Sequence, residues 1–159
     1  MTMSQIEQIA MLCQHSFSGP AWHGPSVKEV VSDVTAQQAA AAPALGRFSI
    51  WQHLLHMIFW KDQITCAMHG ELMPRSADIA AQDNWPTVSD TGESAWQATM
   101  AELSACEQRL QQALANFPES RLTDKVGGRA YDFAFALYSV PCHDHYHAAQ
   151  IVLLKKGLS

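Results

Sequence analysis

The chain has 159 residues, of which 48% are hydrophobic and 16% charged, and 10 Lys and Arg against 15 Asp and Glu give it a net charge of −5. A chain of this length is expected to form a single domain over residues 1–159, burying roughly two-thirds of the surface that its unfolded form exposes. The acidic balance and the lack of a basic stripe argue against nucleic acid as a partner.

Four capping boxes, in which Ser or Thr is followed three residues later by Glu or Gln, mark expected helix starts in the first third of the chain. They predict a long helix at residues 4–17, two short connecting helices of which Pro43 ends the second, and a long helix at residues 49–69 before Gly70. The helix at residues 49–69 is apolar nearly all round, which is typical of a buried helix. The boxes are Ser4 with Glu7, Ser26 with Glu29, Thr35 with Gln38, and Ser49 with Gln52.

Residues 71–90 contain Pro and Asn and show no periodic pattern. We expect a long loop here, and loops of this length are often functional. Asp90 with Glu93 then predicts a long helix at residues 91–117, in which apolar residues recur at spacings of three and four until Pro118 stops it.

Gly127 and Gly128 predict either a hairpin turn or a flexible tip before the last helix. That helix lies within residues 132–156, where Pro141 leaves two alternatives open. It lies either inside a long helix, which it would kink, or in the first turn of a shorter one. Four long helices without a competing strand pattern predict an all-α four-helix bundle, with short connecting helices and a long loop between the second and third main helices.

Three histidines lie in the stretch HDHYH at residues 143–147. At about 100° per residue, His143 and His147 differ by only about 40° around a helix and lie one turn apart on one face. His145 is displaced by about 160° from each and should point away. His143 and His147 can therefore reach one metal ion, whereas His145 is expected to be a surface residue or to have a different role.

A catalytic zinc site commonly has three protein ligands and an open fourth position, so a third ligand must come from another helix. His53 and His56 lie on one arc of the helix at residues 49–69, and either could complete the set. A single histidine on an apolar face is more often a core residue satisfied by a hydrogen bond. Several titratable rings in one apolar core are costly unless they are used, so the joint pattern favours a metal site.

The four cysteines form no C-x-x-C pair and are expected to be reduced thiols. They are Cys13, Cys66, Cys106 and Cys142. Cys142 lies about 100° around the helix from His143 and is not counted as a ligand. The sequence shows neither a secretory signal pattern nor an apolar stretch of membrane-spanning length, so the expected location is the cytoplasm, without a membrane partner.

Four stretches, WHGPSVKEVVSDVTAQQAAAAP, SIWQHLLHMIFW, DNWP and HDHYHAAQIVLLKK, carry a resemblance that spans most of the chain. The sequence resembles the DinB/YfiT-like superfamily of metal-dependent four-helix bundle proteins, and its last stretch is similar to the family's H-D-x-Y-H-x-G-Q-I ending. Ala149 stands where the family usually has glycine, and both residues are small. Carried over position by position, the resemblance implies His56 rather than His53 as the third ligand, with His143 and His147 as the closing pair.

The resemblance also implies a divalent metal ion, nickel or zinc, with a fourth position for water, and a homodimer. Three neutral imidazoles leave the ion its full positive charge, so that a bound thiol or water is acidified. We therefore expect thiol-dependent S-transferase-like chemistry, in which the ion activates a low-molecular-weight thiol toward a small-molecule substrate. The alternatives are a hydrolase that uses metal-bound water and a non-catalytic dimeric module with a structural metal. No catalytic residue is assigned.

Several residues near the predicted ligands have less specific roles. Asp144 makes the stretch superficially similar to the H-E-x-x-H of zinc proteases, but nothing else of that pattern is present, and Asp144 is expected to support the fold or orient a ligand histidine. His53 is expected to fill the core, with orientation of His56 or contact with a substrate as alternatives. Trp22, His23 and the other tryptophans are expected to pack rather than to form a substrate platform.

Overall fold

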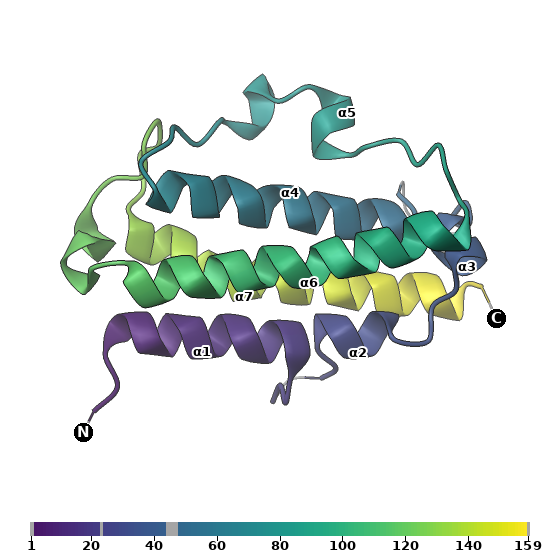
Figure 1. The fold of residues 1–159 in the computed structure, drawn as a ribbon, viewed down its shortest axis with the longest axis horizontal. Helices are drawn as coiled ribbons and strands as arrows, with labels where there is room; N and C mark the ends of the chain where they lie inside the picture. Colours follow the sequence, from purple (N-terminus) through teal and green to yellow (C-terminus); the bar gives the residue numbers. More distant parts are fainter. Residues whose placement is uncertain (1, 23, 44–47, 159) are drawn as a thin grey trace.

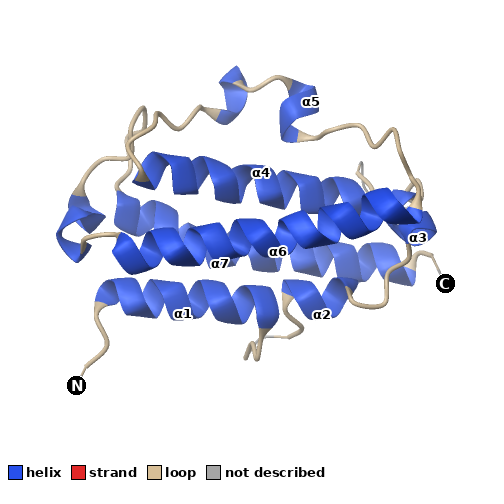
Figure 2. Cartoon of the chain, in the orientation of Figure 1, coloured by secondary structure: helices blue, strands red, loops and turns tan. Residues whose placement is uncertain are grey.

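In the computed structural model, which describes residues 2–22, 24–43 and 48–158, the helices run side by side along one axis (Figures 1 and 2). No strand is present in this described part; one isolated antiparallel bridge joins Lys125 to Asp132. The elements are α1 (Gln5–Ser18), α2 (Val27–Val31), α3 (Ala36–Ala40), α4 (Ile50–Met68), η1 (Ser76–Asp78), α5 (Ala81–Asn84), α6 (Glu93–Asn116), η2 (Glu119–Thr123) and α7 (Phe133–Lys156).

The four long helices α1, α4, α6 and α7 form the bundle (Figure 1). Both α1 and α4 pack against α6 and α7, so each of these helices has two long neighbours. The short helix α2 continues beyond α1 and packs on α7, while α3 packs on α4 and α6. The expected all-α four-helix bundle with short connecting helices is confirmed. None of the helices in the described residues is long and apolar enough to cross a membrane.

Local capping sets most of the helix starts. All four predicted capping boxes are present, with both reciprocal hydrogen bonds, at Ser4, Ser26, Thr35 and Ser49. The helix start predicted from Asp90 with Glu93 is wrong, because α6 begins at Glu93 with Gly92 as its N-cap and no side-chain cap. The Oδ1 atom of Asp90 instead accepts from the backbone N–H of Gly92 at 2.8 Å, a local turn that competes with capping.

The last helix is a single long one. It begins after Asp132, whose side chain accepts from the backbone N–H of Phe135 at 2.9 Å. Pro141 lies inside the helix, so the first of the two alternatives is correct. Because proline has no N–H, one backbone hydrogen bond is missing in the middle of α7.

The two long connections contain short ordered elements that periodicity does not predict. The segment after α4 contains η1 and α5, and η2 follows α6. Before α7 the backbone N–H of Val126 donates to the carbonyl of Tyr131 at 3.1 Å, and Gly128 has a φ of 78° that favours glycine. Gly127 and Gly128 thus form the hairpin turn, not a flexible tip.

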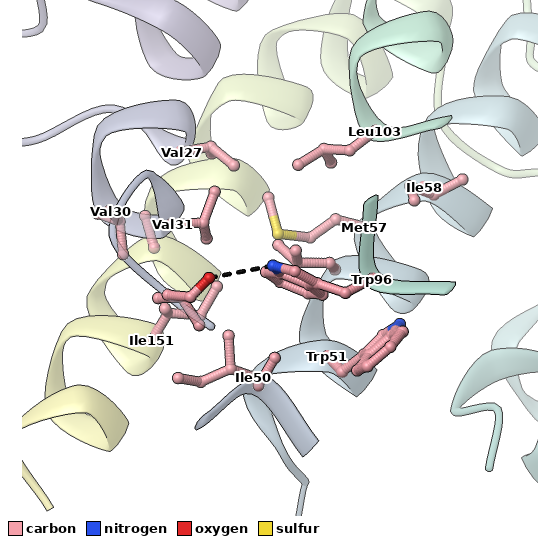
Figure 3. Close-up of a cluster of buried hydrophobic side chains, with 14 of the residues drawn as sticks. Val27, Val30, Val31, Ile50, Trp51, Met57, Ile58, Trp96, Leu103 and Ile151 are labelled. Carbon is pink, nitrogen blue, oxygen red and sulfur yellow. Dashed lines mark hydrogen bonds between the residues drawn. The ribbon is translucent and has the colours of Figure 1, made fainter. Parts of the chain in front are cut away.

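Two hydrophobic clusters fill the bundle, one toward each end. In the cluster shown in Figure 3, the rings of Trp51 and Trp96 pack edge to face with their centroids 5.1 Å apart. The indole N–H of Trp96 donates to the carbonyl of Val34 at 3.0 Å, and that of Trp51 donates to Thr99 Oγ1 at 2.9 Å. These two tryptophans pack in the core as expected.

Two other expectations concern exposure and oxidation state. Trp22, which lies between α1 and α2, is fully exposed, which contradicts the expectation that it packs. His23 lies outside the described residues. The four cysteines are free thiols, as predicted.

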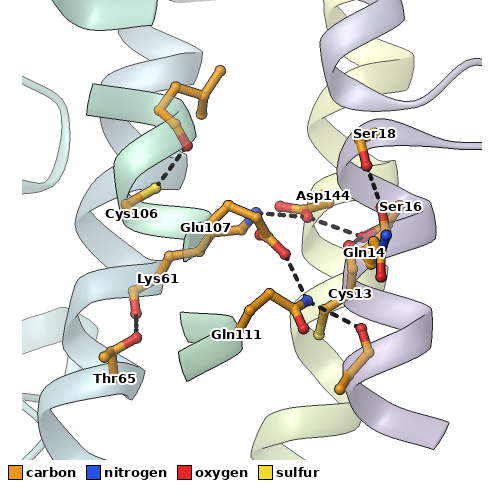
Figure 4. A network of polar contacts seen from close by, with 12 residues as sticks. Cys13, Gln14, Ser16, Ser18, Lys61, Thr65, Cys106, Glu107, Gln111 and Asp144 are labelled. Atoms are coloured by element: carbon orange, nitrogen blue, oxygen red, sulfur yellow. Dashed lines mark hydrogen bonds and ion pairs between the residues drawn. The ribbon is translucent and has the colours of Figure 1, made fainter. Parts of the chain in front are cut away.

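A buried polar layer lies between the two hydrophobic clusters and consists of one residue from each long helix, Ser16, Lys61, Glu107 and Asp144. Figure 4 shows the contacts of these four residues. The ammonium group of Lys61 lies 2.6 Å from Glu107 Oε2 and 2.9 Å from Asp144 Oδ2. Ser16 donates to Asp144 Oδ2 at 3.0 Å. Burial opposes the charge on Lys61, but the carboxylates of Asp144 and Glu107 raise its pKa above the ordinary value, so Lys61 stays protonated.

Candidate metal centre

Three of the predicted histidines come together where α4 packs against α7. His56 comes from α4, and His143 and His147 lie one turn apart on α7. The Nε2 atom of His143 lies 3.3 Å from Nε2 of His56 and 3.0 Å from Nε2 of His147. One ligand atom from each ring lies within 4.8 Å of the other two, so the three side chains could hold a metal ion.

The separations between the ring nitrogens are compatible with a single ion. Nitrogen ligands about 2.05 Å from a tetrahedral zinc-like ion lie about 3.3 Å from one another. The separation between His56 and His143 equals this value, and that between His143 and His147 is slightly shorter. The ligand atoms of His56 and His147 also lie within 4.8 Å of each other, so all three rings are close enough to share one ion after side-chain adjustment.

Burial lowers the pKa of each ring in the cluster. Desolvation, with a smaller contribution from neighbouring rings, lowers the pKa of His143 to about 4 and that of His147 to about 3. Desolvation also lowers the pKa of His56. The rings are therefore neutral near pH 7, which is the form in which histidine offers a nitrogen lone pair to a metal.

Hydrogen bonds between neutral rings cannot provide a partner for all three Nε2 atoms, those of His56, His143 and His147. Nδ1 of His56 lies 2.9 Å from the carbonyl oxygen of Asn84, which can only accept, so Nδ1 carries the proton and Nε2 has a free lone pair. Nε2 of His143 faces two ring nitrogens but carries at most one hydrogen. A cation between the three lone pairs would satisfy all of them, and on this ground the residues fit a bound metal.

His53 contacts the cluster from the side. Its Nδ1 lies 3.0 Å from Nδ1 of His147, and burial lowers the pKa of His53 to about 4. A proton on Nδ1 of His147, donated to His53, leaves Nε2 of His147 unprotonated toward the other two rings. His53 is buried as expected, but it does not only fill the core, because its Nδ1 contacts the ring of His147.

The short helix α5 and the residue after it cover the cluster. The Trp85 ring stacks on the His56 ring, with centroids 3.9 Å apart and an angle of 8° between the planes, and meets His53 edge-on at 5.3 Å. Asn84 accepts from Trp60 Nε1 at 2.9 Å through Oδ1, while its carbonyl holds His56. Sequence reasoning missed Asn84 and Trp85 as site residues, although the DNWP stretch that contains them was a signal.

The other residues considered near the site lie outside it. Asp144 is completely buried and bonded to Lys61 and Ser16, so it supports the fold, one of its two expected roles. Burial raises the pKa of its carboxyl group. Neither the half-buried His145 nor the exposed Cys142 belongs to the three-histidine cluster.

A cavity of about 480 Å³ opens beside the cluster. Two of the three histidines, His56 and His143, form part of its wall. Its volume falls in the range of small-molecule sites. The other lining residues are Trp60, Lys61, Ile64, Met73, Ser76, Asn84, Arg129, Tyr131, Phe135, Ala136, Ser139 and Val140.

In a comparison with protein families, the model described as the DinB superfamily matches residues 23–151. This span includes the three clustered histidines, His53, the α5 segment and the cavity. Neither the curated proteins nor the solved structures give a significant match.

Proposed function

The chain belongs to the DinB superfamily, and from this premise we propose that it is a metal-dependent enzyme that binds one divalent ion through His56, His143 and His147. The observation that carries the proposal is the convergence of three histidine ring nitrogens beside a small-molecule cavity. The ion, nickel or zinc, would acidify a bound thiol and make it nucleophilic near neutral pH. The reaction that we propose is S-transfer from a low-molecular-weight thiol to a small-molecule electrophile.

The surrounding residues would keep the ligand rings in place. The carbonyl of Asn84 fixes the proton of His56 on Nδ1, and His53 can do the same for His147. Trp85 covers one face of His56 and limits the access of water to that side. These contacts orient the nitrogens before an ion binds, which raises its affinity.

The absence of a carboxylate among the described residues of the cavity wall favours thiol transfer over hydrolysis. No carboxylate of the described residues lines the cavity. Asp144, the one acidic residue next to a ligand in sequence, is bonded to Lys61 in the buried polar layer. The ion would acidify bound water and a bound thiol alike, but hydrolysis of an amide or ester also calls for a group that delivers a proton to the leaving group, a common role of carboxylic acids.

A purely structural metal site is less well supported. Such sites are closed by a fourth protein ligand, whereas catalytic sites keep one position open. The cluster in the described residues has three candidate ligands, and the cavity lies against two of them. A coordination position that faces the cavity would accept a thiol or water.

Metal analysis of the purified protein tests the site. We expect roughly one divalent ion per chain, the number that one three-histidine site binds. His147→Ala should lose this ion, whereas the matched control His145→Ala, two residues away on α7, should keep it. Full metal content in the His147→Ala protein would overturn the assignment.

Thiol transfer is tested with zinc-loaded and nickel-loaded protein, glutathione or cysteine, and 1-chloro-2,4-dinitrobenzene as electrophile. In this reaction the thiolate sulfur forms a bond to the ring carbon, chloride leaves, and the thiol proton goes to the buffer. The loaded protein should exceed the uncatalysed rate, and His147→Ala should not. Turnover of ester or amide substrates without thiol transfer would favour the hydrolase instead.

We also propose that the chain forms a homodimer through the exposed face of α7. Phe135, Tyr146 and Leu153 lie within about 20° of one another around this helix, and each is more than 60% exposed. A row of large apolar side chains on one face is typical of a helix that packs against a partner. Light scattering should give about twice the mass of one chain, 17.6 kDa, and a monomer would contradict this proposal.

A further inference from the structure

The cavity beside the histidines has a second end at the hairpin before α7. Arg129 and Tyr131 of this hairpin line the cavity together with His56 and His143. A molecule that fills the cavity can therefore contact the candidate metal centre and the hairpin at the same time. The side chains at the hairpin end therefore limit the kind of molecule that can bind in the cavity.

The wall between the two ends is mainly apolar and carries no negative charge. Among the described residues no Asp or Glu lines the cavity. Lys61 also lines the cavity, but its ammonium group is buried between two carboxylates of the polar layer, which already balance its charge. The apolar part of the wall consists of Trp60, Ile64, Met73, Phe135, Ala136 and Val140.

Close backbone packing holds the hairpin in place. The backbone N–H of Met73 donates to the carbonyl of Gly127 at 3.0 Å. A Cβ atom on Gly128 would lie 3.3 Å from the carbonyl oxygen of Met73, and the φ of 78° at Gly128 also favours glycine. The two glycines thus let the hairpin approach the segment after α4 and bring Arg129 to the cavity.

Arg129 has unused hydrogen-bonding capacity at this position. Its Nη2 donates to the carbonyl of Pro74, but its buried Nε has no hydrogen-bond partner. No carboxylate of the described residues forms an ion pair with it. The nearby Asp78 instead pairs with Arg75 through both carboxylate oxygens. Arg129 thus brings to the cavity wall a positive charge that no carboxylate of the described residues pairs with, and such a charge favours an anionic ligand.

We propose that this cavity binds a small organic carboxylate whose anionic group pairs with Arg129 and whose apolar body extends along the cavity toward His56 and His143. The planar guanidinium group matches the geometry of a carboxylate and can form charge-assisted hydrogen bonds to it. The aromatic and aliphatic wall accounts for the apolar body, and the size of the cavity accounts for a small molecule. This proposal rests on the proposed function only for the contact between the apolar body and an ion at the histidines. The pairing of the carboxylate with Arg129 does not depend on a bound metal.

Binding of 4-phenylbutyrate, measured by calorimetry on the full chain, tests the proposal against its uncharged analogue 4-phenylbutanol and against 4-phenylbutyl phosphate. We expect the carboxylate to bind at least roughly tenfold more tightly than the alcohol, the factor that one charge-assisted hydrogen bond contributes. Equal binding of the two would overturn the proposal whether or not any variant folds. Tighter binding of the phosphate would assign the site to phosphate esters instead of carboxylates.

Arg129→Met should weaken 4-phenylbutyrate by a similar factor and leave 4-phenylbutanol unchanged. Arg121→Met is the matched control, because Arg121 pairs with Asp124 and lies outside the cavity. The same measurements on zinc-loaded protein and on metal-free His147→Ala protein separate the two proposals. Dependence on Arg129 in both proteins supports the carboxylate site even if no metal binds, whereas binding that requires zinc but not Arg129 would overturn it.

Discussion

Replacement of Lys61 by methionine would remove the only cation in the buried polar layer. In the structure Lys61 lies 2.6 Å from Glu107 and 2.9 Å from Asp144, and all three side chains are buried (Figure 4). Methionine has a similar length and fills a similar volume, so Lys61→Met tests the charge more than the packing. The variant leaves two buried carboxyl groups without their counter-ion.

The expected loss of stability is large. Removal of one partner from a buried ion pair costs about 3–5 kcal/mol, because it leaves an uncompensated buried charge. The free energy of unfolding of a typical domain is only about 5–15 kcal/mol. When Glu107→Gln and Asp144→Asn are added to Lys61→Met, no charge remains in the layer, and most of the lost stability should return. The metal content should be unchanged, because Lys61 is not a candidate ligand.

Urea unfolding of the metal-free protein, followed by circular dichroism, measures this loss. Arg109→Met is the matched control, because Arg109 also pairs with two carboxylates, those of Asp62 and Glu102, but is 44% exposed. Exposed pairs contribute roughly 0–1 kcal/mol, so this control should change the free energy of unfolding little. If Lys61→Met costs no more than Arg109→Met, the argument from burial is refuted.

Two further predictions concern the histidines. His53→Ala should lower the zinc affinity by roughly 10–100-fold without abolishing binding, because it removes the group that orients His147 but no ligand; unchanged affinity in a zinc titration would contradict this role. The metal-free protein should become less stable as the pH falls from about 6.5 toward 4. Burial lowers the pKa values of His53 and His147 to about 4 and about 3 in the folded protein. In this pH range the unfolded chain therefore binds more protons than the folded one, which favours unfolding. Urea midpoints should reveal a slope of about 1.4 kcal/mol per pH unit for each histidine that titrates only in the unfolded chain. The slope should be smaller in His53→Ala, and a stability that stays flat or rises over this range would show that the rings are not desolvated as described.

Most helix boundaries could be predicted from the sequence because capping is a local interaction. A Ser or Thr and a Glu or Gln three residues later satisfy each other's backbone N–H groups without help from the rest of the chain. The four boxes therefore form as expected. At Asp90 two local interactions compete, and the turn to Gly92 forms in place of a cap. Sequence spacing does not reveal which of two such interactions is more stable.

Part of the site is equally local. The one-turn spacing of His143 and His147 fixes their common face in any helix. Periodicity left His53 and His56 as equal candidates for a third ligand, and the family resemblance favoured His56. The structure brings Nε2 of His56 to the cluster and Nδ1 of His53 to the far side of His147. That His56, His143 and His147 bind the ion stays a prediction until metal analysis tests it.

The amino-acid sequence by itself determined the all-α class, the order of the long helices and the pairing of His143 with His147, because these depend on interactions within a few residues. Only the tertiary structure brought Asn84 and Trp85 onto His56, joined Ser16, Lys61, Glu107 and Asp144 into one layer, and brought Arg129 to the cavity. These contacts join residues far apart in the chain. They arise from the way α4 and α7 pack together and from the path of the connections across them, which no local pattern encodes.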